Sequence, residues 1–285
     1  MKILVTGARG QLGYDVCREL QSRNIAHKGV DVDDFDITDA ASTSAYVTAY
    51  IPTAVIHCAA FTAVDRAESE PARCHLINVT GTENLATAVA EINAKLLYLS
   101  TDYVFCGNGD FPHATDAPTA PLSVYGASKL LGEEAVRNAT NRHFIVRTSW
   151  VFGTHGNNFA KTMLRLSETQ PALNVVDDQI GSPTYTRDLA VLLCDMIATE
   201  QFGTYHATNE GFCSWADFAE EIMQQSNRHT VIRRVASEEY PTAAPRPRNS
   251  RLSKDKLTDN GFSRLPYWRD ALRRYLEEER TQSRQ

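Results

Sequence analysis

The sequence predicts an α/β protein in which a doubly wound parallel sheet is followed by a smaller α/β lobe. In the first half, short apolar runs alternate with segments of helical periodicity, as is typical of parallel strands joined by crossover helices. These apolar runs are nearly continuous, which favours strands that are buried on both faces. After about residue 150 the regular alternation of apolar runs and helical segments ends, and proline and glycine divide the chain into shorter elements.

The first half supplies the strands and helices of the predicted sheet. We expect strands at 2–7, 26–31, 54–59, 94–100 and 143–149. We expect helices between them at 12–22, 39–50, 71–91 and 125–139. Residues 1–150 are therefore predicted to form the first domain, with some later strands returning to its sheet.

The second half is predicted to form mainly a separate lobe, over residues 151–285. We expect helices at 157–169, 186–199, 214–226 and 267–279, and short strands at 173–176, 204–207 and 230–235. Loops rich in proline and glycine separate these elements, as in "DDQIGSPTY" and "YPTAAPRPRNS".

Composition excludes several classes of function. The chain has 285 residues and a net charge of −6 without a basic block, so nucleic acid is not an expected partner. No apolar run approaches the roughly 20 residues that span a bilayer, and the first apolar run is too short for a signal-peptide core. The six cysteines form no C-x-x-C pair. We therefore expect reduced thiols in a cytoplasmic protein that has no membrane partner.

A glycine-rich turn, "TGARGQLG" at 6–13, links the first strand to the first helix. Glycines let the backbone turn tightly and approach a pyrophosphate, which then sits at the free N–H groups of the helix. This context indicates a Rossmann-type dinucleotide site, although the spacing G-x-x-G-x-x-G differs from G-x-G-x-x-G by one residue. An ordinary turn is the alternative. The candidate cofactor contacts in this turn are Gly7, Arg9, Gly10, Gln11, Leu12 and Gly13.

Asp31 ends the second strand, 18 residues after Gly13. A carboxylate at this place accepts hydrogen bonds from the adenosine ribose and repels a 2′-phosphate, which favours NADH. Arg9 or Lys28 could nevertheless accommodate the phosphate of NADPH. The sequence therefore leaves NADPH and NADH open.

Two further stretches carry candidate cofactor contacts. Asp36 and Ile37 follow the second strand and are expected along the adenine. Ala59, Ala60 and Phe61 follow the third strand, in "HCAAFT". The small alanines would let the backbone approach the cofactor, although simple strand packing explains them equally well.

The stretches "STDYVF" and "VYGASK" carry the predicted chemistry. Thr101 and Asp102 end the fourth strand at its carboxyl edge, where ligands bind in open α/β sheets. Tyr125 lies one helical turn before Lys129. If hydride reduces a ketone, Tyr125 can protonate the alkoxide, Lys129 can lower the tyrosine pKa and hold the nicotinamide ribose, and Thr101 can orient the substrate oxygen. A surface Tyr–Lys pair is the alternative.

Taken together, the motifs resemble the extended short-chain dehydrogenase/reductase family, and within it the dTDP-4-dehydrorhamnose reductases. The likeness runs from about residue 2 to 275 through "TGARGQLG", "HCAAFTAVDRAE", "NVTGT", "STDYVF", "YGASKLLGE", "RTSWVFG", "NNF", "DDQIGSPT" and "RPRNS". The resemblance implies reduction of the C4 ketone of dTDP-4-dehydro-β-L-rhamnose by NADPH or NADH. It also implies that Thr101, Tyr125 and Lys129 form the catalytic trio, and that Thr101, Asp102 and Trp150 contact the dTDP-sugar in a substrate-binding lobe.

Three residues refine this interpretation. Related nucleotide-sugar dehydratases carry a glutamate, which serves as the base for dehydration, where this chain has Tyr103. Because this chain lacks that base, the resemblance favours a reductase over a dehydratase. Asn158 is a candidate substrate contact in the second lobe. Arg246 could clasp the diphosphate with two hydrogen bonds, although Arg248 could take its place and a solvated loop arginine is the alternative.

A metal ion and the oligomeric state stay open. Some reductases of this family bind Mg²⁺ through glutamates at a dimer interface, the first of them just after the glycine turn. This chain has the shorter Asp15 there. An exposed aspartate in the first turn of a helix also stabilises the helix N-terminus without a metal. The chain is expected to be a monomer or a homodimer.

Two other functions are compatible with the same motifs. The regulatory subunit of methionine adenosyltransferase resembles this family and serves as a non-catalytic binding partner. Another nucleotide-sugar reductase or a 4-epimerase would use the same fold, and an epimerase would regenerate tightly held NAD rather than consume NADH.

Overall fold

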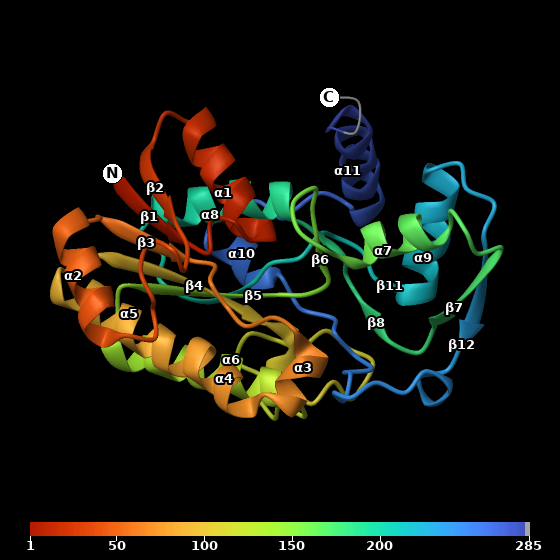
Figure 1. The fold of residues 1–285 in the computed structure, drawn as a ribbon, viewed down its shortest axis with the longest axis horizontal. Helices are drawn as coiled ribbons and strands as arrows, with labels where there is room; N and C mark the ends of the chain where they lie inside the picture. The colour runs from red at the N-terminus through yellow and green to blue at the C-terminus, as the bar shows by residue number, and fades with distance from the viewer. Residues whose placement is uncertain (283–285) are drawn as a thin grey trace.

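The centre of the molecule is a sheet of six parallel strands in the order β10-β5-β4-β3-β1-β2 (Figure 1). The computed structural model describes residues 1–282. The strands are β1 (Lys2–Thr6), β2 (Ala26–Val30), β3 (Ala54–His57), β4 (Lys95–Thr101), β5 (His143–Thr148) and β10 (Gly203–His206). The predicted doubly wound parallel sheet is confirmed.

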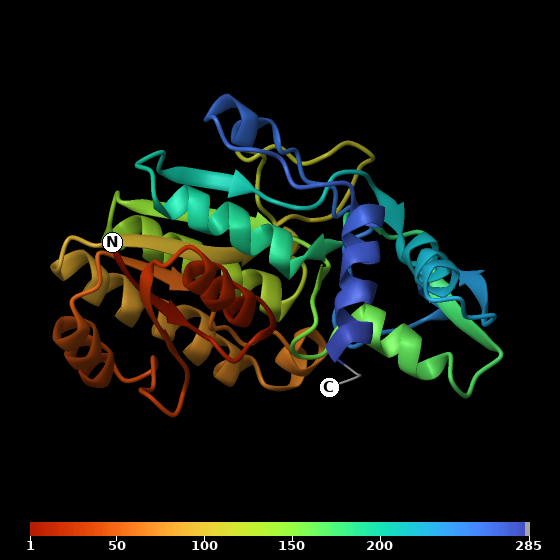
Figure 2. The ribbon, with the colours of Figure 1, turned by 90° about the horizontal axis from the view of Figure 1, so that it is seen from above.

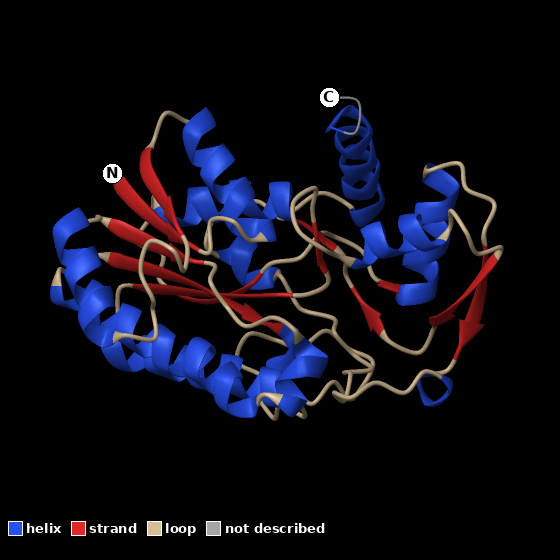
Figure 3. Cartoon of the chain, viewed as in Figure 1, coloured by secondary structure: helices blue, strands red, loops and turns tan. Residues whose placement is uncertain are grey.

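Helices cover both faces of this sheet (Figure 3). One face carries α1 (Gln11–Ser22) and α8 (Thr186–Ile197), and the other carries α2 (Ala40–Tyr50), α5 (Gly81–Glu91) and α6 (Val124–Ala139). Side chains alternate between the two layers, because successive residues of a strand point to opposite faces. Leu97 packs in the cluster beneath α1 and α8, whereas its neighbours Leu96 and Tyr98 pack in the cluster beneath α2, α5 and α6.

The helix expected over 71–91 is interrupted. It consists of α4 (Pro71–His75), a π-helical turn over Leu76–Thr80, and α5, and a short helix that was not expected, α3 (Val64–Ser69), precedes it. The wide turn carries Asn78, whose buried amide accepts a hydrogen bond from the Phe61 N–H at 2.7 Å and donates one to the Phe61 carbonyl at 3.1 Å. Asn78 therefore fixes the loop that follows β3.

The second lobe is smaller and has its own aromatic core (Figure 2). Its elements are β6 (Val151–Phe152), α7 (Phe159–Leu166), β7 (Ala172–Val176), β8 (Ile180–Gly181), β9 (Thr184–Tyr185), β11 (Cys213–Ser214), α9 (Trp215–Gln225), β12 (Val231–Val235) and α11 (Trp268–Gln282). The core is built around Phe152, Phe218 and Tyr275. Beyond residue 150, α8 and β10 belong to the layers of the central sheet, and α10 (Asp255–Asp259) packs against β10. The boundary at 150 itself stays a prediction.

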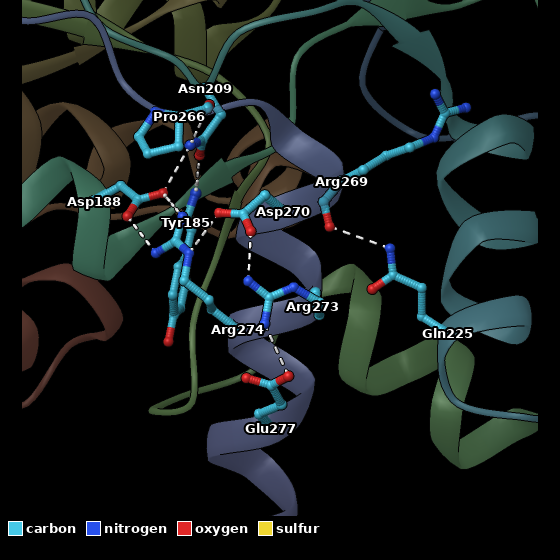
Figure 4. A network of polar contacts seen from close by, with 10 residues as sticks. All are labelled: Tyr185, Asp188, Asn209, Gln225, Pro266, Arg269, Asp270, Arg273, Arg274 and Glu277. Atoms are coloured by element: carbon cyan, nitrogen blue, oxygen red, sulfur yellow. Dashed lines mark hydrogen bonds and ion pairs between the residues drawn. The ribbon is translucent and has the colours of Figure 1, made fainter.

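The C-terminal helix α11 lies between the central sheet and the second lobe and is hydrogen-bonded to α8 (Figures 2 and 4). Arg274 donates hydrogen bonds to both carboxylate oxygens of Asp188, at 2.6 and 2.7 Å. Asn209 donates to Asp188 at 2.8 Å and accepts from the Tyr185 N–H at 2.8 Å. A planar guanidinium that binds a carboxylate at two points fixes orientation as well as distance. Within residues 1–282 no helix combines the length and apolar character needed to cross a membrane.

Candidate active site

A cavity of about 1040 Å³ opens at the carboxyl ends of the central strands. Its volume is at the upper end of the range for small-molecule sites, which suits two ligands side by side. The predicted site residues that line it are Gly7, Arg9, Gly10, Gln11, Leu12, Gly13, Asp31, Asp36, Ile37, Ala59, Ala60, Thr101, Asp102, Tyr125, Lys129 and Trp150. The fold thus gathers residues from the first 150 positions around one space.

The glycine turn brings three backbone segments too close together for any side chain. Gly7 has a φ of +67°, and a Cβ built on it would lie 2.6 Å from the Ala59 nitrogen. A Cβ on Gly13 would lie 2.1 Å from the Gly7 carbonyl oxygen. The first turn of α1 therefore starts directly at the cavity, with its N–H groups free for an anion. This cradle fits the pyrophosphate of a dinucleotide.

An acidic group and an exposed arginine lie together at the far end of the turn. The Asp31 carboxylate accepts a hydrogen bond from the Arg9 N–H at 3.1 Å. The Arg9 guanidinium lies 2.6 Å from Asp33 and 3.7 Å from Asp31, and the Arg9 side chain is 61% exposed. Exposed ion pairs of this kind contribute little stability, so the guanidinium is available to an incoming phosphate.

Hydrogen bonds order the hydroxyl groups at the end of β4. The Thr101 hydroxyl donates to Asp102 at 2.9 Å, and Thr101 is hydrogen-bonded to Tyr125. This hydrogen bond lowers the pKa of Tyr125, as expected when the Thr101 hydroxyl stabilises the phenolate. Tyr125 lines the cavity beside Thr101.

Burial dominates the acidity of Tyr125. Desolvation raises its pKa well above the usual value, and the Asp102 carboxylate acts in the same direction. The net shift is upward because loss of water around the phenol dominates it, and the expected lowering of this pKa by Lys129 stays a prediction. The phenol stays protonated at neutral pH.

Lys129 is buried at the same site, with 3% of its surface exposed. Desolvation lowers its pKa to about 7, and the Glu133 carboxylate counteracts this shift. Its nitrogen lies 4.0 Å from the centre of the Tyr98 ring, where an ammonium is attracted by the π-electrons. The amine is therefore near the midpoint of its titration at neutral pH in the ligand-free protein.

Within residues 1–282, Thr148 Oγ1 is a buried polar atom of the cavity lining that has no hydrogen-bond partner. Such atoms are costly unless a ligand satisfies them. Thr148 was missed by the sequence analysis. It pairs in register with Thr101 on the neighbouring strand, and the rule that parallel strands end at the same edge could have identified it.

Comparison with known proteins matches this arrangement to one family. The family described as "RmlD substrate binding domain" matches residues 1–281. The chain belongs to the RmlD family. The spore coat polysaccharide biosynthesis protein SpsK of Bacillus subtilis is 44% identical, with 97% of both chains covered. The dTDP-4-dehydrorhamnose reductase of Escherichia coli K12 is 38% identical, with 98% of both chains covered.

A solved structure extends the likeness of this RmlD-family chain to three dimensions. The dTDP-4-dehydrorhamnose reductase of Bacillus anthracis, determined in complex with NADP, is 42% identical. It superposes with a TM-score of 0.95 over 98% of this chain and 100% of that one. The UDP-glucose 4-epimerase of Thermus thermophilus, at 18% identity and a TM-score of 0.84, shares the fold.

Trp150 reaches the cavity from the start of the second lobe. Its φ is +50°, which is unusual for a bulky residue. Its ring stacks on Trp215 with centroids 3.7 Å apart and an interplanar angle of 15°. Trp215, at the start of α9, thus supports a residue that lines the cavity.

Three predicted contacts of the RmlD-family chain lie outside the cavity lining. Phe61 is buried against Ala67 and Cys74. Asn158 caps α7 by accepting from the Lys161 N–H at 2.9 Å, and its amide donates to Gln11 at 2.8 Å. Their assignment as ligand contacts stays a prediction.

The third predicted contact outside the cavity lining is Arg246, which is ion-paired with Asp65 and hydrogen-bonded to Tyr103. Arg248 is 60% exposed and ion-paired with Glu238. Neither arginine lines the cavity.

Asp15 does not have the environment that a metal site requires. It was expected to be exposed, yet it is fully buried because α8 packs across α1. It accepts a hydrogen bond from Thr186 at 2.5 Å and lies 3.3 Å from Arg18. Among residues 1–282 no group of three metal-ligating side chains gathers. These residues do not fit Mg²⁺, because a guanidinium already neutralises the carboxylate.

Proposed function

We propose that this chain reduces the C4 ketone of dTDP-4-dehydro-β-L-rhamnose to dTDP-β-L-rhamnose. One observation supports this most strongly: Thr101, Tyr125 and Lys129 line the same cavity as the glycine turn. A dinucleotide on that turn and a ketone at Tyr125 would share one space. The names of the relatives agree with this substrate.

The proposed reaction needs one hydride and one proton. When bound, the reduced nicotinamide supplies the hydride. As the hydride adds to C4, the electron pair of the carbonyl moves to its oxygen, and the Tyr125 O–H gives that oxygen its proton. Tyr125 becomes a phenolate and later recovers a proton from solvent. Thr101 holds the substrate oxygen beside Tyr125, and Lys129 binds the ribose and stabilises the phenolate.

The raised pKa of Tyr125 supports this direction of proton transfer. A phenol with a high pKa keeps its proton at neutral pH, which is the form an acid needs. A sugar alkoxide is a stronger base than an ordinary phenolate, which favours transfer of the proton to the substrate oxygen.

We propose that both NADPH and NADH serve as cofactors. Asp31 and the exposed Arg9 guanidinium lie together at the cavity, which supports a hydrogen bond from the 2′-hydroxyl of NADH to Asp31 and a contact between Arg9 and the 2′-phosphate of NADPH. A cytoplasmic location is part of the proposal, and it is supported by the six cysteines, which are all free thiols.

The test follows absorbance of the reduced cofactor with dTDP-4-dehydrorhamnose as substrate. We expect turnover by the wild type and a loss of about 10²–10⁴-fold in Tyr125→Phe, with unchanged cofactor binding. Tyr240→Phe is the matched control, because Tyr240 is 56% exposed. Cofactor that is recycled without net consumption would instead identify an epimerase. A Tyr125→Phe variant within about tenfold of wild type would overturn the proposed role of this residue.

A further inference from the structure

Tyr103 lies directly beside the proposed proton donor. It follows Asp102 in a short 3₁₀ turn over Asp102–Val104 at the end of β4, and it lines the cavity. Its ring meets the Tyr125 ring edge to face, with centroids 5.6 Å apart and an angle of 77°. The phenol of Tyr103 can therefore reach a ligand that contacts Tyr125 in the cavity.

The partner of the Tyr103 hydroxyl determines which way its proton points. Arg246 donates a hydrogen bond from Nη1 to the Tyr103 oxygen, at 2.9 Å. A guanidinium has only donors, so the Tyr103 oxygen is the acceptor in this contact. Burial raises the pKa of Tyr103, so the phenol keeps its own proton at neutral pH. That proton is free for a different acceptor.

Asp65, at the start of α3, holds Arg246 in place. Its Oδ2 accepts from Arg246 Nη2 at 2.5 Å. Its Oδ1 accepts from the backbone N–H of Ala244 at 3.1 Å, so the same carboxylate also holds the segment that carries Arg246. The guanidinium is thereby fixed from two sides and cannot turn toward a diphosphate without breaking both contacts.

We propose that Tyr103 donates a hydrogen bond to a hydroxyl oxygen of the hexose, and that Arg246 and Asp65 are positioning residues for it. The inference rests on the proposed function, because it names a sugar contact in that same site. It assigns Arg246 to the orientation of a phenol, in place of the diphosphate clasp that the sequence suggested. Selectivity for the hexose then depends on Tyr103, whereas the nucleotide is recognised elsewhere.

A double-mutant cycle tests this assignment. Tyr103→Phe removes only the hydroxyl, Arg246→Gln removes its partner, and the double variant removes both. Calorimetry compares the affinity for dTDP-rhamnose with that for dTDP, which lacks the hexose, and steady-state kinetics give kcat/KM for the keto-sugar. We expect each single variant to lose about tenfold in kcat/KM and in affinity for dTDP-rhamnose, as for one buried hydrogen bond. The affinity for dTDP stays unchanged.

The cycle separates orientation from direct binding. If Arg246 acts through Tyr103, the double variant is no worse than Tyr103→Phe alone, and Arg246→Lys restores part of the loss. Arg228→Gln, which breaks an exposed ion pair with Glu168, is the control and stays at the wild-type level.

Several outcomes would overturn the inference. Additive losses, a fall in the affinity for dTDP itself in Arg246→Gln, or an unaffected Tyr103→Phe would each do so. If Arg246→Gln does not bind cofactor as the wild type does, Asp65→Asn replaces it in the cycle. Absence of turnover by the wild type would refute the proposed function, whereas the calorimetric comparison would still report on the hexose contact.

Discussion

Glu133 and Arg147 form a buried two-point ion pair between α6 and β5, with two N–O distances of 2.8 Å. Their side chains are 0% and 3% exposed. The Ser100 hydroxyl donates to the same carboxylate at 2.6 Å. Because Ser100 precedes Thr101 and Glu133 follows Lys129 on α6, this cluster fixes the helix of the proposed donor against the strand of the proposed orienting residue.

Glu133→Gln should destabilise the protein strongly. Removing one partner leaves the Arg147 guanidinium buried without its counter-charge, which costs about 3–5 kcal/mol. Urea unfolding of the ligand-free protein measures this free energy. Glu200→Gln is the control, since it breaks an exposed pair with Arg142 and should change the free energy of unfolding by less than about 1 kcal/mol. Equal effects of the two substitutions would contradict the structural role of Glu133.

Lys129 should make the ligand-free protein less stable as the pH falls toward neutrality. Its pKa is about 7 in the folded chain and near 10.5 when the lysine is in water. As the pH falls from about 10.5 to about 7, the unfolded chain takes up a proton before the folded chain does, so the free energy of unfolding falls. Below about pH 7 the lysine is protonated in both the folded and the unfolded chain, so the free-energy cost of burying its charge no longer changes with pH.

Lys129→Met removes this dependence. As the pH falls from 10 to 7, the stability of the variant relative to wild type should increase by about 1.4 kcal/mol per pH unit, and it should then level off. Urea unfolding at each pH gives the comparison. Lys256→Met, at a partly exposed position, is the control, and the same pH trend in both variants would refute the assignment to Lys129.

Asp102 should produce an acid limb in the pH profile of kcat/KM. Burial raises its pKa to about 6, so the carboxylate is charged above that pH and neutral below it. Protonation removes the acceptor at the cavity, and kcat/KM should fall about tenfold per pH unit on the acid side. Lys129 cannot cause this limb, because it gains its charge as the pH falls. Asp102→Asn should lack the limb, and an unchanged limb in that variant would exclude Asp102 as its source.

The balance between Arg9 and Asp31 should set the preference for NADPH over NADH. Arg9→Gln removes the cation beside the ribose and should lower the ratio of kcat/KM for NADPH to that for NADH by about tenfold. Asp31→Asn removes the repulsion of a 2′-phosphate and should raise the same ratio by a similar factor. Parallel assays with both cofactors measure the ratio. If neither substitution moves it, the 2′-position is recognised by other groups.

The sequence was sufficient to predict the sheet, because apolar runs and helical periods report burial locally. It also placed Thr101, Tyr125 and Lys129 around one cavity, since strand ends and the first turn of a helix meet at the carboxyl edge. The burial of Asp15 could not be predicted, because it depends on Thr186, which α8 brings across α1.

The contacts of Arg246 could not be predicted from the sequence either. Its partner Asp65 lies 181 positions away, and no local pattern joins them. The upward shift of the Tyr125 pKa was also not predictable, because a charge one turn away is visible in the sequence whereas the loss of water around the phenol is not.

The position of β10 at the edge of the sheet has a consequence for synthesis on the ribosome. β5 leaves the exit tunnel well before its neighbour β10, and α1 emerges long before α8, which covers its apolar side. During that interval the nascent chain presents an open strand edge and an uncovered helix. Completion of the central sheet must therefore wait until His206 has emerged, and a chaperone that binds apolar segments would find its target in this window.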